Sequence, residues 1–325
     1  MIESLRIRNF KSIKSLDLNC KRVNLFIGEP NTGKSNILET IGVLSHVNHG
    51  FLNLFVRFEN MSNLFFDQDL ENPINISFNE NRIGIKFQNG LFLGDYFDSK
   101  DRGKIFSYNY DGSGTRGGSE TAFRNCLQFK FYRFAIRRDF PNQRSEYLYP
   151  PDGDNLSQIL ITRRELRNFM QKIFNKFGYK LAIQMPEGKI TIQKGEDIII
   201  VYPYSTISDT LRRIVFYLAA IYSNKGSVIA FEEPEAHAFP YYTKYLAERI
   251  ALDQNKNQYF ISTHNPYLLK SVIEKAPKEE VSVNITYIEN YETKVKQLSE
   301  TEIREILDLD LDVLFNLERF LAPQV

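Results

Sequence analysis

Short runs of apolar residues alternate with polar ones along much of the chain. Six runs have the period of a half-buried strand: 5–10, 13–18, 22–28, 74–79, 83–88 and 129–136. The first three follow one another with brief polar breaks, and they predict an opening set of antiparallel strands. A helix is predicted directly after them, over residues 36–47.

A second helix is predicted over residues 161–180, where apolar residues recur at helical spacing. Its apolar stripe consists of Leu166, Phe169, Met170, Ile173, Phe174 and Phe177. Thr162 and Glu165 have the spacing of a capping box at its start. Its basic residues are Arg163, Arg164, Arg167 and Lys172. They fit either a solvated face of a packed helix or a surface that binds nucleic acid.

The last third of the chain predicts a helix and two strands that end in polar residues. Residues 208–223 form a strongly apolar run that begins with Ser208 and Asp209, two good helix-capping residues. This helix leads into an apolar strand over 227–231, and a later strand begins at residue 258 and ends in His264.

A phosphate-binding motif fills the break between the third strand and the first helix. The sequence GEPNTGKSN fits G-x-x-x-x-G-K-[ST] through Gly28, Gly33, Lys34 and Ser35. In such a loop, backbone N–H groups surround phosphates, the lysine reaches the β- and γ-phosphate oxygens, and the hydroxyl ligates Mg²⁺. The expected nucleotide contacts are Gly28, Glu29, Pro30, Asn31, Thr32, Gly33, Lys34, Ser35 and Asn36.

Acidic residues directly follow the strand 227–231, and an ionised carboxylate at a buried strand end needs a cation nearby. Without the upstream phosphate motif, these acids would be expected simply to face solvent. With it, we expect Glu232 to hold Mg²⁺ through water and Glu233 to orient or deprotonate the attacking water. Glu235 is expected to cap a helix or face solvent. A lone histidine is usually structural, but His264 can reach the γ-phosphate or that water.

A second glycine pattern is less specific. Gly112, Gly114 and Gly117 fit G-x-G-x-x-G after a strand-like run, the spacing of dinucleotide-binding loops. Polar residues and glycines flank them, as they do in flexible surface loops. We therefore expect a mobile loop here and no dinucleotide.

Composition narrows the partners only slightly. The 325 residues include 41 basic and 40 acidic side chains, so no overall field attracts nucleic acid or an anionic membrane, although a local patch remains compatible. Cys20 and Cys126 lack metal-ligand spacing, and no apolar run is long enough for a membrane helix. We expect a cytoplasmic protein with reduced thiols.

Several of these segments together resemble a known class of proteins. GEPNTGKS, ISDTLRR, FEEPEAHAFP and ISTHNPYLL, in this order, are similar to motifs in the ATP-binding-cassette heads of RecF, SMC and OLD ATPases. The nearest likeness is to the OLD type, through EEPEAH. NFKS at 9–12 and PPDGDNL at 150–156 extend the resemblance over most of the chain.

The resemblance implies roles for individual positions. It makes residues 28–35 the Walker A loop, Glu232 the Walker B acid, Glu233 the catalytic base, residues 236–240 the D-loop and His264 the switch histidine. Lys11 and Ser12 would lie near the nucleotide base or phosphates. In these families two heads sandwich two ATPs, and the signature serine, here Ser208, touches the nucleotide of the other head.

The chain also departs from the family pattern. Asp209 and Thr210, and no glycine, follow Ser208, and the Walker B acid is a glutamate where aspartate is commoner. The Q-loop glutamine stays open among Gln68, Gln128 and Gln143. No heptad pattern predicts a long coiled coil. Asp308, Asp310 and Asp312 are expected to be solvated acids of a capped helix, since too few residues follow them to complete a nuclease domain.

The sequence thus predicts an α/β protein: a P-loop NTPase of the ABC head type, with an antiparallel β lobe, a mainly parallel core sheet and a helical or irregular middle part. The expected division is 1–49, 50–205 and 206–325 within one head. The expected function is an ATP- and Mg²⁺-dependent switch. It would assemble as a homodimer or higher homo-oligomer and control a separate nuclease or toxin, in phage defence or DNA maintenance. The alternative is a RecF-like DNA clamp that uses the basic positions 133–144 and 163–172.

Overall fold

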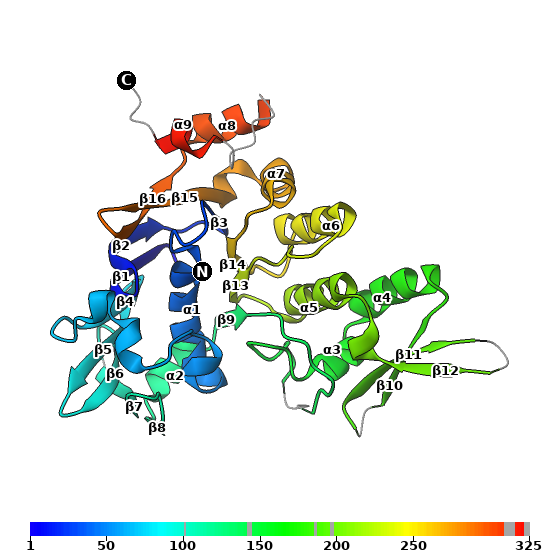
Figure 1. Ribbon diagram of the computed structural model, residues 1–325, viewed down its shortest axis with the longest axis horizontal. Coiled ribbons are helices and arrows are strands. Elements are labelled where there is room, and N and C mark those ends of the chain that lie inside the picture. Colours follow the sequence, from blue (N-terminus) through cyan, green and yellow to red (C-terminus); the bar gives the residue numbers. More distant parts are fainter. Residues whose placement is uncertain (101, 142–144, 185–186, 196–197, 309–315, 322–325) are drawn as a thin grey trace.

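The computed structural model describes residues 1–100, 102–141, 145–184, 187–195, 198–308 and 316–321 (Figure 1). Its centre is a six-stranded sheet of order β16-β15-β3-β14-β13-β9. The strands are β3 (Val23–Ile27), β9 (Phe129–Tyr132), β13 (Val228–Glu232), β14 (Gln258–Ser262), β15 (Val281–Glu289) and β16 (Glu292–Gln297). All neighbours are parallel except β16, which is antiparallel to β15. The predicted fold class, with its parallel core, is confirmed.

A seven-stranded antiparallel sheet of order β2-β1-β4-β5-β6-β7-β8 forms the second layer. Its strands are β1 (Ser4–Phe10), β2 (Ile13–Asn19), β4 (Ile74–Phe78), β5 (Asn81–Gln88), β6 (Leu91–Phe97), β7 (Arg102–Tyr108) and β8 (Gly114–Arg116). The prediction that residues 22–28 join this set was wrong. All five residues of β3 are buried, as a central strand covered on both faces requires, whereas β1 alternates.

One helix packs between the two sheets and three cover the far face of the core sheet (Figure 1). They are α1 (Lys34–His49) on the inside and α5 (Asp209–Ser223), α6 (Pro240–Ala251) and α7 (Pro266–Lys275) on the outside. The core strands serve both layers because their side chains alternate: Leu25 packs in the cluster of the outer helices, and Phe26 in that of α1.

The remaining elements build a helical part and a small sheet beside α5 (Figure 1). They are α3 (Leu156–Thr162), α4 (Arg164–Lys176), β10 (Lys180–Gln184), β11 (Lys189–Lys194) and β12 (Ile200–Pro203). The helix α2 (Glu120–Cys126) packs instead against α1 and β7. Single turns of 3₁₀ helix occur at Leu52–Leu54, Met61–Leu64, Phe66–Gln68, Tyr204–Thr206 and Lys278–Glu280. The segment 50–205 therefore contributes strands to all three sheets.

The helix predicted over 161–180 is shorter in the structure, where α4 spans Arg164–Lys176 and residues 161 and 162 end α3. Arg163 adopts an extended conformation between α3 and α4, and Thr162 donates back to the carbonyl of Gln158 instead of capping α4. The expected capping box was therefore wrong. Phe177 ends α4 and is 53% exposed, so it does not belong to the buried stripe.

The glycine pattern at 112–117 forms a β-hairpin and not an open loop. Gly114 pairs with Tyr108 across β7 and β8, and Gly112 lies in the turn with a φ of 78°. A dinucleotide-binding loop would connect a parallel strand to a helix. The hairpin agrees with the expectation that no dinucleotide binds here, while the expected loop was wrong.

The chain continues after the core sheet with α8 (Glu300–Asp308) and α9 (Leu317–Leu321). Ser299 and Glu302 form the cap of α8, as predicted for a capped helix. Glu302 is buried and pairs with Lys296 at 2.9 Å. Asp310 and Asp312 lie outside the described residues. None of the described helices is long and apolar enough to span a membrane.

Candidate functional site

Three parallel strands of the core sheet end side by side. Glu232 at the end of β13 is in register with Ser262 at the end of β14, and Ser262 is in register with Phe26 near the end of β3. The residues that follow these strands, Gly28, Glu233 and Thr263, therefore lie at one edge. The predicted arrangement of the strands that end near Gly28, Glu232 and His264 is confirmed.

Lys34 begins α1 and turns back into the loop that precedes it. Its side chain is 5% exposed, and Nζ donates to the carbonyls of Gly28 at 2.9 Å and Glu29 at 2.6 Å. Burial lowers the pKa of Lys34 to about 8, against the raising influence of Glu233 and Glu29. The ammonium thus sits among oxygen atoms in a loop whose geometry suits an anion.

Two threonines from β15 and β16 press on the glycines of the loop. A Cβ at Gly28 would lie 2.2 Å from the Thr286 carbonyl oxygen, and one at Gly33 would lie 2.1 Å from Thr293 Oγ1. Thr32 bonds to both threonines: its hydroxyl lies 2.8 Å from Thr286 Oγ1, and its carbonyl accepts from Thr293 Oγ1 at 3.1 Å. The glycines are therefore required by close packing as well as by backbone angle.

Ser12 joins the turn after β1 to the phosphate loop. Its hydroxyl accepts from Asn36 Nδ2 at 2.7 Å and lies 2.7 Å from Thr293 Oγ1. Glu29, Pro30 and Asn31 form the exposed rim of the loop. The predicted contact residues of the loop and Ser12 thus lie together.

The buried carboxylate of Glu39 lies beside the loop and pairs with three cations. The sequence patterns did not predict this group of residues. Glu39, on α1, has a fully buried side chain and pairs with Lys11, with Arg57 at 2.8 Å and with Arg133 at 3.3 Å. Arg57 and Arg133 also pair with Glu232, at 3.0 and 3.1 Å. We call these five residues the Glu39 cluster.

The environment of Glu232 favours its charged form. Burial opposes ionisation, but the Ser35 hydroxyl, Arg133 and Arg57 outweigh it and lower the pKa of Glu232 below its usual value. Ser35 and Glu232 together present hard oxygen atoms of the kind that Mg²⁺ prefers. The donor set therefore fits the magnesium ion that the phosphate loop implies.

Glu233 and His264 face each other at the same edge. His264 Nε2 lies 3.5 Å from Glu233 Oε1, and both side chains are partly exposed. Glu233 has a φ of 44°, and its N–H donates to the Ser262 carbonyl at 3.0 Å. Burial and the charge of Lys34 lower the pKa of His264, so the imidazole favours its neutral form.

Glu235 does not cap a helix or face solvent, and that expectation was wrong. Its side chain is buried, and Oε1 accepts from Thr263 Oγ1 at 2.5 Å and from the His264 N–H at 3.3 Å. Burial raises the pKa of Glu235 to about 7. The third acid of the motif therefore positions the backbone of His264.

Ser208 takes part in local contacts in this chain. Its side chain caps α5 by accepting from the Leu211 N–H at 3.4 Å, which agrees with its predicted capping role. Thr210, two residues further on, donates to the His237 carbonyl at 2.6 Å and so joins the start of α5 to the segment 236–240.

The glutamines considered for a Q-loop lie elsewhere. Gln128 precedes β9 at the opposite end of the sheet, Gln68 lies in the 3₁₀ turn Phe66–Gln68, and Gln143 is outside the described residues. The position at the carboxyl end of β9, next to Glu232, is occupied by Arg133.

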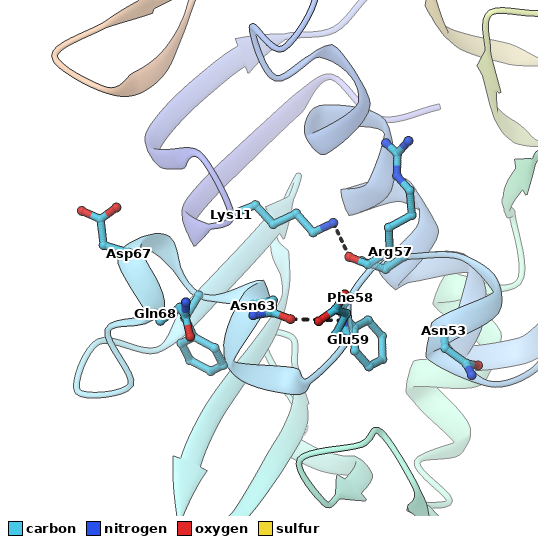
Figure 2. A pocket seen from close by; sticks show the side chains of 10 residues that line it. Lys11, Asn53, Arg57, Phe58, Glu59, Asn63, Asp67 and Gln68 are labelled. Carbon is cyan, nitrogen blue, oxygen red and sulfur yellow. Dashed lines mark hydrogen bonds between the residues drawn. The ribbon is translucent and has the colours of Figure 1, made fainter.

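A cavity of about 870 Å³ opens beside the Glu39 cluster (Figure 2). Lys11 and Arg57 form the wall nearest the cluster, and Lys11 Nζ donates to the Arg57 carbonyl at 2.6 Å. Phe58, Asn63 and Gln68 line its other sides. Its wall therefore combines apolar surface with amide groups.

Comparisons with solved structures give the same fold. An SMC head bound to the C-winged helix domain of ScpA aligns with a TM-score of 0.58 at 15% identity, covering 94% of this chain and 99% of that one. An SMC head with an extended coiled coil, bound to the C-terminal domain of ScpA and derived from Pyrococcus furiosus, aligns with a TM-score of 0.52 at 13% identity, covering 95% and 99%. The head architecture is therefore confirmed.

The sequence comparisons identify the family. No curated protein gives a significant match. Residues 23–270, most of the chain, match the family described as "AAA domain, putative AbiEii toxin, Type IV TA system". The chain therefore belongs to this AAA family, and its fold is similar to that of SMC heads.

Proposed function

We propose that this protein is a Mg²⁺-dependent ATPase that works as a molecular switch. The observation that carries the proposal is the meeting of Lys34, Glu233 and His264 at the carboxyl ends of three parallel strands, where their charges affect one another. Hydrolysis of a phosphoanhydride needs a cation for the phosphates and a base for the water, and these side chains provide both.

The loop from Gly28 to Asn36 would hold the phosphates. No side chain caps α1 at Gly33, so the first N–H groups of the helix are available to an anion. Lys34 would exchange its bonds to the Gly28 and Glu29 carbonyls for phosphate oxygens. Nearby phosphate charge would raise its lowered pKa, so that protonation and binding support each other.

Glu232 and Glu233 would have separate roles in the reaction, one at the metal ion and the other at the attacking water. Mg²⁺ held near Ser35 and Glu232 would neutralise charge on the phosphates. Arg57 and Arg133 keep the Glu232 carboxylate in place through their ion pairs. Glu233 would accept a proton from water, and His264, 3.5 Å away, would orient that carboxylate or the water.

The cavity beside Lys11 is the candidate place for the nucleotide base. It adjoins the Glu39 cluster through Lys11 and Arg57, and its volume of about 870 Å³ is ample for a planar ring system. Phe58 and Phe65 offer apolar surface, and Asn63 offers an amide to a polar ring edge.

ATP would join two copies of the head. Ser208 is exposed at the start of α5, where it is accessible to a nucleotide held by a second copy. The Thr210–His237 hydrogen bond would connect that contact to the segment after Glu233. We propose that association controls a separate nuclease or toxin in phage defence or DNA maintenance, and the toxin named in the family description is in keeping with this role.

The second candidate is an ATP-dependent DNA clamp. Arg164, Arg167 and Lys172 are exposed along α4, as a surface for phosphates would require. Arg133 and Arg137, however, pair with Glu232 and Asp152, so part of the basic stretch 133–144 is committed within the protein.

The decisive experiment measures molecular size with and without ATP and Mg²⁺. We expect Glu233→Gln to bind ATP and accumulate as a dimer or larger assembly, because the trapped nucleotide is not hydrolysed. Lys34→Ala is the matched control that should lose ATP binding and remain in its unassembled form. A Glu233→Gln protein that binds ATP without changing size would contradict the switch.

DNA binding provides the second test. A clamp would retain DNA in the presence of ATP with an affinity that falls steeply as salt rises. The triple change Arg164→Gln, Arg167→Gln and Lys172→Gln should then abolish retention. DNA-independent assembly that is unaffected by these changes would favour the effector switch.

A further inference from the structure

A second cavity, of about 570 Å³, lies at the amino-terminal edge of the core sheet, opposite the edge that carries Lys34. The starts of β9 and β13, the end of α5 and the loop before β14 contribute to its wall. Its charged and aromatic lining residues include Arg124, Lys130, Glu146, Tyr147, Arg163 and Lys225. Four cations thus face a single carboxylate among the described lining residues.

Lys130 is the most deeply placed of these cations. Its side chain is 2% exposed, and its Nζ lies 3.0 Å from His49 Nε2 and 3.6 Å from the centre of the Tyr147 ring. His49 Nδ1 lies 2.8 Å from the Ser45 carbonyl and must donate to it, so Nε2 is an acceptor. Lys130 is therefore held by a neutral imidazole and an aromatic face.

His49 and Tyr147 are neutral, so they hold the Lys130 ammonium in place without balancing its positive charge. No acid of the described chain forms an ion pair with Lys130, and an unpaired charge is costly to bury. Burial accordingly lowers the pKa of Lys130 to about 7. An anion in the cavity would supply the missing charge.

The wall of the cavity has further unused hydrogen-bonding capacity. Arg163 Nε is buried and has no partner, although its Nη2 donates to the Glu146 carbonyl at 2.7 Å. Near the end of α5, the carbonyls of Ala220 and Ile221 already accept hydrogen bonds from the side chains of Asn224 and Asn255. These two carbonyls are therefore not free to repel an anion. The buried part of the wall therefore presents an unpartnered donor, Arg163 Nε, together with one unpartnered acceptor, Asn224 Oδ1.

We propose that this cavity binds a small ligand that carries a phosphate group, with Lys130 and Arg163 holding the anion. The exposed Arg124 and Lys225 would attract it at the rim. The planar guanidinium of Arg163 suits phosphate oxygens, and the volume suits a molecule of up to nucleotide size. The site is separate from the phosphate loop and does not depend on ATP hydrolysis.

Sulfate is the first probe, because its charge is constant between about pH 5 and 9. Calorimetry would use the Lys34→Ala protein, so that the phosphate loop contributes little. Lys130→Met and Arg163→Gln should each weaken sulfate binding by about 10-fold or more, the effect of losing one charge-assisted hydrogen bond. Lys172→Gln, an exposed cation of α4 outside the cavity, is the matched control and should change little.

The pH dependence gives an independent signature. Sulfate affinity should fall as pH rises from about 7 to 9, because Lys130 loses its proton. The other groups facing Lys130 do not titrate in that range: the pKa of His49 is lowered to about 3 and that of Tyr147 is raised, both by burial. The other charged groups that line the cavity are Glu146, Arg124, Arg163 and Lys225. The Lys130→Met protein should lose this dependence.

A second comparison identifies the source of the phosphate. AMP binding tighter than inorganic phosphate, with no binding of adenosine, would indicate a nucleotide, whereas equal binding of AMP and phosphate would indicate the free anion. If Lys130→Met fails to fold, Arg163→Gln and Lys225→Gln carry the test. The proposal is wrong if sulfate does not bind at millimolar concentration, or if binding is the same in all of these variants.

Discussion

The two edges of the core sheet bury cations in different ways. At the carboxyl edge, Lys11, Arg57 and Arg133 surround the fully buried Glu39, and the two arginines also pair with Glu232. At the amino edge, Lys130 meets a neutral histidine and a tyrosine ring. Each cation at the carboxyl edge pairs with a carboxylate of the chain. No acid of the described residues pairs with Lys130, so its positive charge is left for a ligand to balance. Charge compensation thus distinguishes a cluster that supports the fold from one that fits a ligand.

Glu233 is the residue at the carboxyl edge whose change should have the largest effect. Its partly exposed carboxylate has no part in the Glu39 cluster, so Glu233→Gln should leave the fold and ATP binding intact. Hydrolysis should fall by roughly 10²–10⁴-fold, as expected when a positioned base is lost. Single-turnover assays and calorimetry would measure both quantities. Normal hydrolysis by this variant would place the base elsewhere.

The Glu39→Gln variant tests how far the buried Glu39 carboxylate stabilises the fold by balancing the charges of its three cations. The variant would leave three cations around a neutral amide, and we expect a loss of about 2–4 kcal/mol in the free energy of unfolding, less than for fully buried pairs because the arginines are partly exposed. Urea unfolding would measure it. Glu292→Gln, which breaks surface pairs with Lys14 and Lys294, is the control and should have no resolvable effect.

The contrast between the edges also explains what the sequence could predict. The phosphate loop and the strand ends at Glu232 and His264 were predictable, because each depends on residues close together in the chain. Glu39 gave no such signal, since its partner Arg133 lies 94 residues away. Whether a buried acid meets a cation is decided by strand order, which local patterns do not contain.

Two errors have the same origin. The strand 22–28 was assigned to its sequence neighbours, but burial on both faces places β3 in the centre of the parallel sheet. Glu235 was expected at the surface because charged residues usually are. Its partners Thr263 and His264 come from the next strand, and only the register of β13 and β14 brings them together.

Lys130 should give the protein a stability that rises with pH. Its folded pKa of about 7 lies below the usual lysine value of 10.5, so the unfolded chain binds more protons between these values. The free energy of unfolding should increase by up to about 1.4 kcal/mol per pH unit above pH 7. Lys130→Met should remove this slope in thermal melts at low sulfate and phosphate. An unchanged slope would show that another group is responsible.

Glu235 should give a slope of opposite sign at the other edge. Its folded pKa of about 7 lies above the usual glutamate value of 4.5, so the folded chain binds more protons and stability falls as pH rises between them. Glu235→Gln keeps an acceptor for Thr263 and His264 and should remove the decline, with a gain of about 1–3 kcal/mol at pH 8. Melts at pH 5 and pH 8 would measure this difference.

The smallest expected effect separates the charge of Glu235 from its hydrogen bonds. Glu235→Ala would leave the Thr263 hydroxyl and the His264 N–H without their acceptor, so His264 should shift relative to Glu233. We expect hydrolysis to fall on the order of 10-fold with little change in ATP affinity, because orientation is lost while the phosphate loop is intact. Glu235→Gln is the matched control and should hydrolyse ATP almost as the original protein does. Equal loss in both variants would mean that the charge of Glu235, and not its hydrogen bonds, serves the reaction.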